Sequence, residues 1–150
     1  MKAVIQRVRE AAVSINSSVK GDIQRGLLVY LGIEEDDNQS ESDWLVNKIV
    51  NMRIFSDRDH LMNLSVKDIG GEILVISQFT LIADTRKGHR PSFSRAARPE
   101  AAIPLYKKFI SELEARMEKP VPSGEFGADM QIHSINDGPV TIVVDTRRKE

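Results

Sequence analysis

The stretch MKAVIQRVREAAVSIN, residues 1–16, alternates in the manner of an extended chain. Ala3, Ile5 and Arg7 fall on one face, and the residues between them fall on the other. Such a period of two predicts a β-strand. GLLVYLGI, residues 26–33, is a continuous apolar run that is typical of a strand buried on both faces. The N-terminal third is therefore predicted to be rich in β-structure.

The bulk composition is that of an ordinary globular protein. The 150 residues are 41% hydrophobic and 29% charged, which suits one domain, residues 1–150, with one core. The absence of cysteine excludes disulfides and thiolate chemistry. A net charge of −1 argues against a general polyanion binder. With no long apolar run and no signal-peptide pattern, we expect a cytoplasmic protein without a membrane partner.

Two helices are predicted between the strand-rich ends. Residues 41–54 carry helical apolar spacings, with Ser40 as the expected N-cap. A second helix is expected between Pro99 and Pro120, with Pro104 marking an irregular first turn or a later start. The pattern predicts an α+β single domain: a mainly antiparallel, barrel-like sheet with two main helices.

The segment NDGPVT, residues 136–141, lies between two alternating apolar segments. Asp-Gly in this setting is typical of a hairpin turn, and a proline can begin the following strand. We therefore expect a final hairpin over residues 128–145, with its bend at this segment.

Polar residues end an otherwise apolar strand in ILVISQFTLI, residues 73–82. We expect the strand to continue through this stretch, so that successive side chains alternate between its faces. Buried polar groups need partners, and a polar strand end beside a loop is a common place for a site. The alternative is that Ser77 and Gln78 only satisfy backbone groups of the loop.

The segment from Thr85 to Pro99 is predicted to be a basic loop, because it has Gly and Pro breakers and no periodicity. It contains no acid, one histidine and five cations: Arg86, Lys87, Arg90, Arg95 and Arg98. These charges either keep the surface soluble or position a phosphate backbone, with Phe93 or His89 available to stack on a base.

No metal site is predicted. The three histidines have no metal-ligand spacing, and a Ser-His-Asp triad assembled across the sequence is a weaker alternative. The acidic run from Glu34 to Asp37 matches no calcium loop, so we interpret it as a solvated loop.

Four motifs in order, MKAVIQRV, SQFTL, KGHRPSF and NDGPVT, make the chain closely resemble the D-aminoacyl-tRNA deacylases over essentially its whole length. The resemblance implies an editing hydrolase that cleaves the ester between a D-amino acid and the 3′-terminal ribose of tRNA. It also implies a homodimer with its active sites at the subunit interface, and neither cofactor nor metal.

The resemblance assigns residues to the site. It places four residues of SQFTL in the pocket: Ser77, Gln78, Phe79 and Thr80. It makes Gly138 and Pro139 a Gly-cisPro pair that enters the partner subunit's pocket. Arg7 matches an arginine that helps to hold this pair, and Met130 borders the pocket.

This chemistry suits the residue types. A wall of backbone excludes the side chain of every L-residue, since glycine permits close approach and proline fixes φ. Glycine has no side chain, so we expect glycyl-tRNA to be cleaved too. Backbone N–H groups around Phe79 and Thr80 are expected to form an oxyanion site. Water, aided by the ribose 2′-OH, is preferred to the Thr80 hydroxyl as nucleophile.

A second hypothesis is a non-catalytic module that only binds the tRNA acceptor end. It would use the polar strand end and the basic loop, with Arg86, Lys87 and Arg90 on the RNA. The joint presence of SQFTL and NDGPVT favours the hydrolase, because a binding module does not require both.

Overall fold

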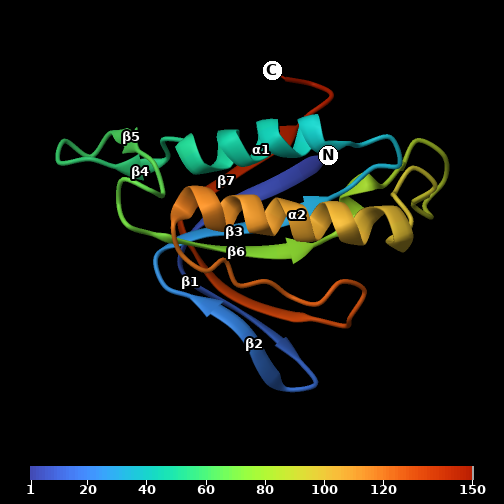
Figure 1. Ribbon diagram of the computed structural model, residues 1–150, viewed down its shortest axis with the longest axis horizontal. Coiled ribbons are helices and arrows are strands. Elements are labelled where there is room, and N and C mark those ends of the chain that lie inside the picture. Colours follow the sequence, from blue (N-terminus) through green and yellow to red (C-terminus); the bar gives the residue numbers. More distant parts are fainter. Residues whose placement is uncertain (150) are drawn as a thin grey trace.

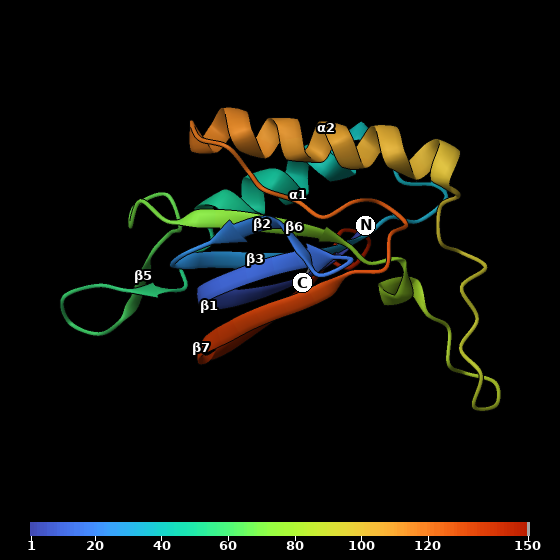
Figure 2. The same cartoon turned by 90° about the horizontal axis from the view of Figure 1, so that it is seen from below.

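The computed structural model describes residues 1–149 and contains a curled five-stranded sheet with two helices on one of its faces (Figures 1 and 2). The elements are β1 (Lys2–Ile15), β2 (Ser18–Ile23), β3 (Gly26–Gly32), α1 (Gln39–Asn51), β4 (Phe55–Ser56), β5 (Met62–Leu64), β6 (Glu72–Ser77), the 3-10 turn η1 (Phe79–Ile82), α2 (Pro99–Met117) and β7 (Gln131–Asp145). The predicted α+β class with two main helices is confirmed.

Strand β1 is the centre of the sheet. Its first half pairs with β3 and its second half with β2, while β7 runs along its opposite edge. These pairs are antiparallel, and β3 pairs with β6 in parallel. The sheet is therefore mainly antiparallel, as predicted. Because β1 changes partner halfway along, the sheet curls instead of extending as a flat layer.

Apolar side chains fill both faces of this curled sheet. On the helix side, Phe109 and Leu113 of α2 and Ile49 of α1 are completely buried against the strands. On the opposite side a smaller cluster is formed by Val8, Ala11, Val13, Ile23, Leu28, Leu74 and Ile76. The run GLLVYLGI contributes Leu27 to the first cluster and Leu28 to the second, so the prediction of a strand buried on both faces is confirmed.

The helix starts differ from the predictions. Helix α1 begins at Gln39, and its N-cap is Asn38, whose side chain accepts from the Ser40 N–H at 2.8 Å. The Glu41 carboxylate accepts from the Asn38 N–H in return, which completes a capping box two residues earlier than expected. Helix α2 starts directly at Pro99, with Pro104 accommodated inside it.

The acidic run is only in part the solvated loop that was predicted: Glu35 and Asp36 are exposed, but the prediction was wrong for Glu34 and Asp37. The Asp37 carboxylate is almost fully buried and lies 2.7 Å from the ammonium of Met1. Glu34 is also buried, with its carboxylate 3.1 Å from the Arg147 guanidinium. The pairing of β1 with β3 and β7 brings both ends of the chain to this loop, where buried charges need partners of opposite sign.

The hairpin predicted at NDGPVT is also wrong. Strand β7 is continuous, and both of its apolar segments pair with β1 instead of with each other. Gln6 opposes Thr141 and Val8 opposes Asn136, so residues 137–140 form a bulge opposite Arg7. The Gly138-Pro139 peptide bond within this bulge is cis, as predicted.

Gly26 provides a test of the strand arrangement. An alanine Cβ at this position would overlap the backbone carbonyl of Glu72, so β3 and β6 would have to separate. We expect Gly26→Ala to lower the free energy of unfolding by at least about 2 kcal/mol in chemical denaturation. Gly88→Ala is the control: its Cβ meets nothing within 4 Å, and only the left-handed backbone costs about 1 kcal/mol. Equal losses in the two variants would contradict the packing of β3 against β6.

Candidate active site

The SQFTL motif lies at a turn and not along a strand. Strand β6 ends at Ser77, whose partner in β3 is Leu31, and the Gln78 N–H donates to the Leu31 carbonyl at 2.8 Å. From Phe79 the chain forms the 3-10 turn η1. The predicted strand continuation is therefore wrong beyond Ser77, because β3 ends at Gly32 and offers no further partner. The motif forms a rim instead of two alternating faces.

A pocket of about 230 Å³ lies at this rim. Its wall combines the end of β6, the start of η1, the loop before β7 and the start of β7: Ile76, Ser77, Gln78, Phe79, Phe126, Gly127, Ala128, Met130 and Ile132. The structure thus brings three of the four predicted SQFTL residues together with Met130. The pocket is mostly apolar, with the polar Ser77 and Gln78 at the strand end.

Thr80 lies beside this pocket and does not line it. The Gln78 side-chain amide donates to the Thr80 hydroxyl oxygen. Within residues 1–149 no histidine or carboxylate is hydrogen-bonded to that hydroxyl. An amide NH₂ cannot accept a proton, so this contact orients Thr80 without activating it.

Two supporting residues were missed by the sequence reasoning. The buried Tyr106 of α2 donates its hydroxyl to the Val75 carbonyl at 3.2 Å, and burial raises its pKa to about 12. Its ring meets the edge of Phe126 in the pocket wall, with centroids 5.9 Å apart. Gly124 leaves room for the Met130 sulfur, which a Cβ would displace. In the sequence, only the resemblance that placed Met130 at the pocket pointed to this wall, and Gly124 carried no signal by itself.

The bulge of β7 is held by side chains on both of its sides. The Arg7 guanidinium donates to the Asp137 carbonyl at 3.0 Å and to the Ile54 carbonyl at 2.7 Å. The Asn136 side chain accepts from the Val140 N–H at 3.2 Å and so spans the bulge from within. Gly138 has φ +132°, and a Cβ there would lie 2.9 Å from the Arg7 guanidinium.

The structure does not bring the bulge and the pocket together within one chain. Gly138 and Pro139 are both exposed, and neither lines the pocket at Ser77. Arg7 is likewise absent from the pocket wall, although it contacts the bulge directly. The predicted site residues therefore form two separate groups, a pocket and an exposed backbone projection.

The basic segment is a loop, as predicted, and its cations are not equivalent. Arg86 forms an ion pair with Asp84 at 2.6 Å and holds the pKa of that carboxyl well below its usual range. Lys87 and Arg90 are exposed and share a surface groove with Asp84, Arg86 and Ser92. At the base of the loop, the Phe93 ring meets the edge of Phe79.

Residues 1–149 contain no group of three histidines and carboxylates able to hold a metal ion. No helix in the same range is long and apolar enough to cross a membrane.

The chain is similar to one protein family and to named proteins over nearly its whole length. Residues 4–145 match the family described as D-Tyr-tRNA(Tyr) deacylase. A protein of Flavobacterium psychrophilum named D-aminoacyl-tRNA deacylase is 57% identical, and the match covers 100% of both chains. A protein of Akkermansia muciniphila with the same name is 59% identical, again over 100% of both chains.

Solved structures share the fold. One named c-Myc DNA Unwinding Element Binding Protein is 42% identical with a TM-score of 0.90, covering 97% of this chain and 98% of that one. A probable eukaryotic D-amino acid tRNA deacylase is 17% identical with a TM-score of 0.81, covering 95% and 97%, which shows the fold alone. The chain belongs to the D-Tyr-tRNA(Tyr) deacylase family. The family and enzyme class predicted from the motifs, a D-aminoacyl-tRNA deacylase, are confirmed.

Arg7 offers a test of how the bulge is held. Arg7→Lys keeps the charge but cannot reach the carbonyls of Asp137 and Ile54 together. We expect it to lower the free energy of unfolding by about 1–3 kcal/mol and to reduce deacylation further than this loss of folded protein explains. Arg9→Lys is the matched control, since the Arg9 side chain is 73% exposed and forms an ion pair with the Asp137 carboxylate instead of bonding the backbone of the bulge. Equal effects of both substitutions would show that Arg7 does not hold the bulge.

Proposed function

We propose that the chain acts as a homodimeric editing enzyme that hydrolyses D-aminoacyl-tRNA, and glycyl-tRNA with it, in the cytoplasm. The substrate ester would enter the pocket at Ser77, and the Gly138-Pro139 bulge of a second subunit would close it. The observation that carries this proposal is the separation of the two groups. A pocket that the bulge of its own chain does not reach, and a firmly held, exposed bulge that does not line that pocket, complement each other between two copies.

The surface of β7 supports such a dimer. None of its fifteen residues is buried, although it is a long edge strand. Ile135 and Val143 are 46% and 70% exposed on it. Exposed apolar residues along a sheet edge are a liability unless another surface covers them. A second copy placed on this strand would cover them and carry its own bulge toward the pocket.

The bulge suits a filter that acts on chirality alone. D- and L-residues differ only in exchanging hydrogen and side chain at one carbon, so a wall of backbone excludes every L side chain whatever its chemistry. Gly138 lets the backbone come close, and Pro139 fixes its own φ. The Arg7 and Asn136 bonds keep the wall in place. This rigidity matters because each factor of ten in selectivity requires about 1.4 kcal/mol.

The proposed chemistry needs orientation more than activation. Water attacks the ester carbonyl carbon, the bond to the ribose oxygen breaks, and that oxygen leaves with a proton. The first N–H groups of a helical turn lack acceptors inside it, so those of Phe79 and Thr80 are suited to receive the developing oxyanion. In the part of the chain that the structure describes, no base is hydrogen-bonded to the Thr80 hydroxyl, which favours water, aided by the ribose 2′-OH, as the nucleophile.

The alternative function is binding of the acceptor end without cleavage. It would need the pocket rim and the basic loop but would give the bulge no role. A hydrolysis assay separates the two functions, because a binding module would release no amino acid.

The function is tested with matched D-aminoacyl-, L-aminoacyl- and glycyl-tRNA in a deacylation assay. We expect rapid release from the D and glycyl esters and none above background from the L ester. Gly138→Ala should lower the rate at least tenfold, because its Cβ would crowd Arg7 and the substrate space. Gly70→Ala is the control, since this glycine also has positive φ and meets nothing within 4 Å. Equal D and L rates, or no release from the D ester, would refute the proposal.

Thr80→Ala tests the choice of nucleophile. Water attack requires no hydroxyl at this position, so we expect kcat to fall by no more than about tenfold, the cost of one orienting hydrogen bond. The measurement is single-turnover deacylation of a D-aminoacyl-tRNA, with RNA binding measured in parallel. Abolished hydrolysis with intact binding would instead identify the Thr80 hydroxyl as the nucleophile.

A further inference from the structure

The basic loop is fixed at its base. The backbones of Asp84 and Ser92 exchange two hydrogen bonds, of 2.8 and 2.9 Å. The Asp84 carboxylate accepts from the Arg86 backbone N–H at 3.0 Å and from its guanidinium at 2.6 Å. Figure 2 shows the closed segment projecting from the body of the molecule. Its base is therefore preformed, while its tip extends into solvent.

Two further contacts join this loop to the pocket and the body. The Phe93 ring, one residue after the closing pair, lies edge-on to Phe79 with centroids 5.2 Å apart. Phe79 also lines the pocket and is 53% exposed. Beyond it, the Glu35 N–H donates to the Arg95 carbonyl at 3.1 Å. The loop thus has a fixed position relative to the pocket mouth.

The cations of the loop differ in what already binds them. The Arg86 guanidinium is paired with the Asp84 carboxylate, because two of its nitrogens donate to the two carboxylate oxygens. Lys87 and Arg90 are exposed, and within residues 1–149 no carboxylate lies within ion-pair distance of either. Both line the groove with Ser92. Two unneutralised cations beside a hydroxyl form a surface suited to phosphate oxygens.

We propose that Lys87 and Arg90 bind backbone phosphates of the RNA strand whose 3′ end enters the pocket. Arg86 is a positioning residue, which shapes the loop through Asp84 and does not contact RNA. The choice of RNA rests on the proposed function. A patch of two free cations on a chain of net charge −1 fits a single strand end better than a long duplex. The exposed Phe79 ring, which lines the pocket and contacts Phe93 at the base of the loop, offers a surface for a terminal base.

The test is the salt dependence of binding to an acceptor-stem minihelix RNA that carries no amino acid. Each phosphate contact contributes about 0.7–0.9 to the slope of log K against log salt concentration. We expect Lys87→Gln and Arg90→Gln each to reduce the slope by about this amount. The double variant Asp84→Asn with Arg86→Gln removes the ion pair without changing net charge. It should weaken binding at every salt concentration and leave the slope unchanged.

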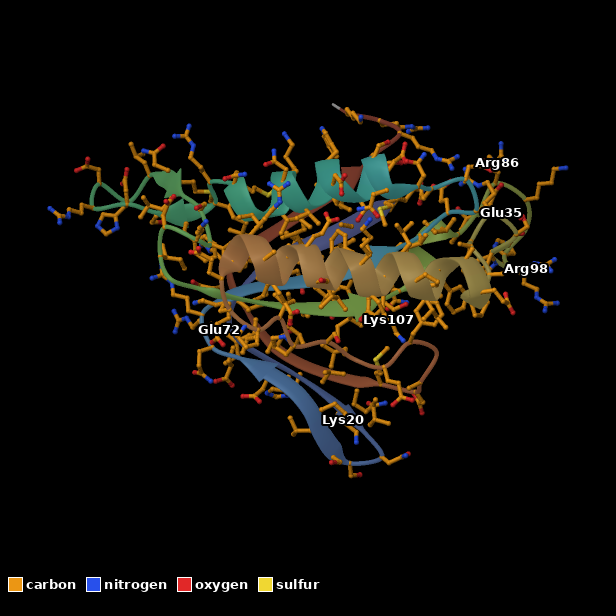
Figure 3. The ribbon with its side chains drawn as sticks, viewed as in Figure 1. Lys20, Glu35, Glu72, Arg86, Arg98 and Lys107 are labelled. Atoms are coloured by element: carbon orange, nitrogen blue, oxygen red, sulfur yellow. The ribbon has the colours of Figure 1, made fainter. Side chains whose placement is uncertain are left out.

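Lys20→Gln is the matched control, because it removes one exposed cation far from the loop; Figure 3 places Lys20 and Arg86 at distant parts of the molecule. It should change neither affinity nor slope. Unchanged slopes for Lys87→Gln and Arg90→Gln would overturn the proposal. A reduced slope in the double variant would show that Arg86 itself contacts phosphate, which would overturn its role as a positioning residue. Duplex DNA bound as tightly as the minihelix would overturn the assignment to an RNA end.

A kinetic readout separates this inference from the proposed function. With D-aminoacyl-tRNA, Lys87→Gln should raise KM more than it lowers kcat, since the loop lies outside the pocket. If no ester is cleaved at all but the slopes still fall as expected, the proposed function fails and the phosphate contacts stand.

Discussion

The pairing of β1 with β7 is the constraint on which the rest of this structure depends. β1 is paired along both edges, and its partner β7 has more residues than the straight register accommodates. The extra residues of β7 form one bulge opposite Arg7, whose guanidinium donates to the Asp137 carbonyl within the bulge and to the Ile54 carbonyl in the segment after α1. The bulge is thus a consequence of register, and its shape is set by a side chain that β1 itself supplies.

Strand alternation, the buried run of β3 and the helical spacings were sufficient to predict the class and the main elements, because each depends on local periodicity. Local signals failed where a distant partner decided the outcome. Asp-Gly between apolar segments is typical of a hairpin, yet β1 offered a pairing edge to both segments. The SQFTL stretch has strand-like residues, but its neighbour β3 had already ended. The buried charges of the acidic run depend on chain ends that meet only in the fold.

The site residues also divide into those that the sequence indicated and those that only the contacts in the fold reveal. The family resemblance assigned Ser77, Gln78, Phe79 and Met130, which line one pocket, together with Thr80, which lies beside it, and the Gly-Pro pair, which lies apart from it. The elements that support them carry ordinary residue types: Tyr106 in a helix, Gly124 in a loop, Asn136 in a strand. Such residues become recognisable only through what they touch. The difference between Arg86 and its neighbours is similar, because the sequence shows three cations and only the geometry shows that one is already neutralised.

Met130, just before β7, and Ile132, near its start, line the chain's own pocket, and the Gly138-Pro139 bulge of β7 lies six residues after Ile132. In a symmetric dimer the same segment would serve two active sites. Its start would line the pocket of its own subunit, and its bulge would close the pocket of the other subunit. A lesion at the bulge in one subunit would then leave that subunit's own pocket intact and impair the opposite one. Mixed dimers of a bulge-defective and a pocket-defective chain would regain one complete site of the two, a complementation that an enzyme with self-contained subunits does not show.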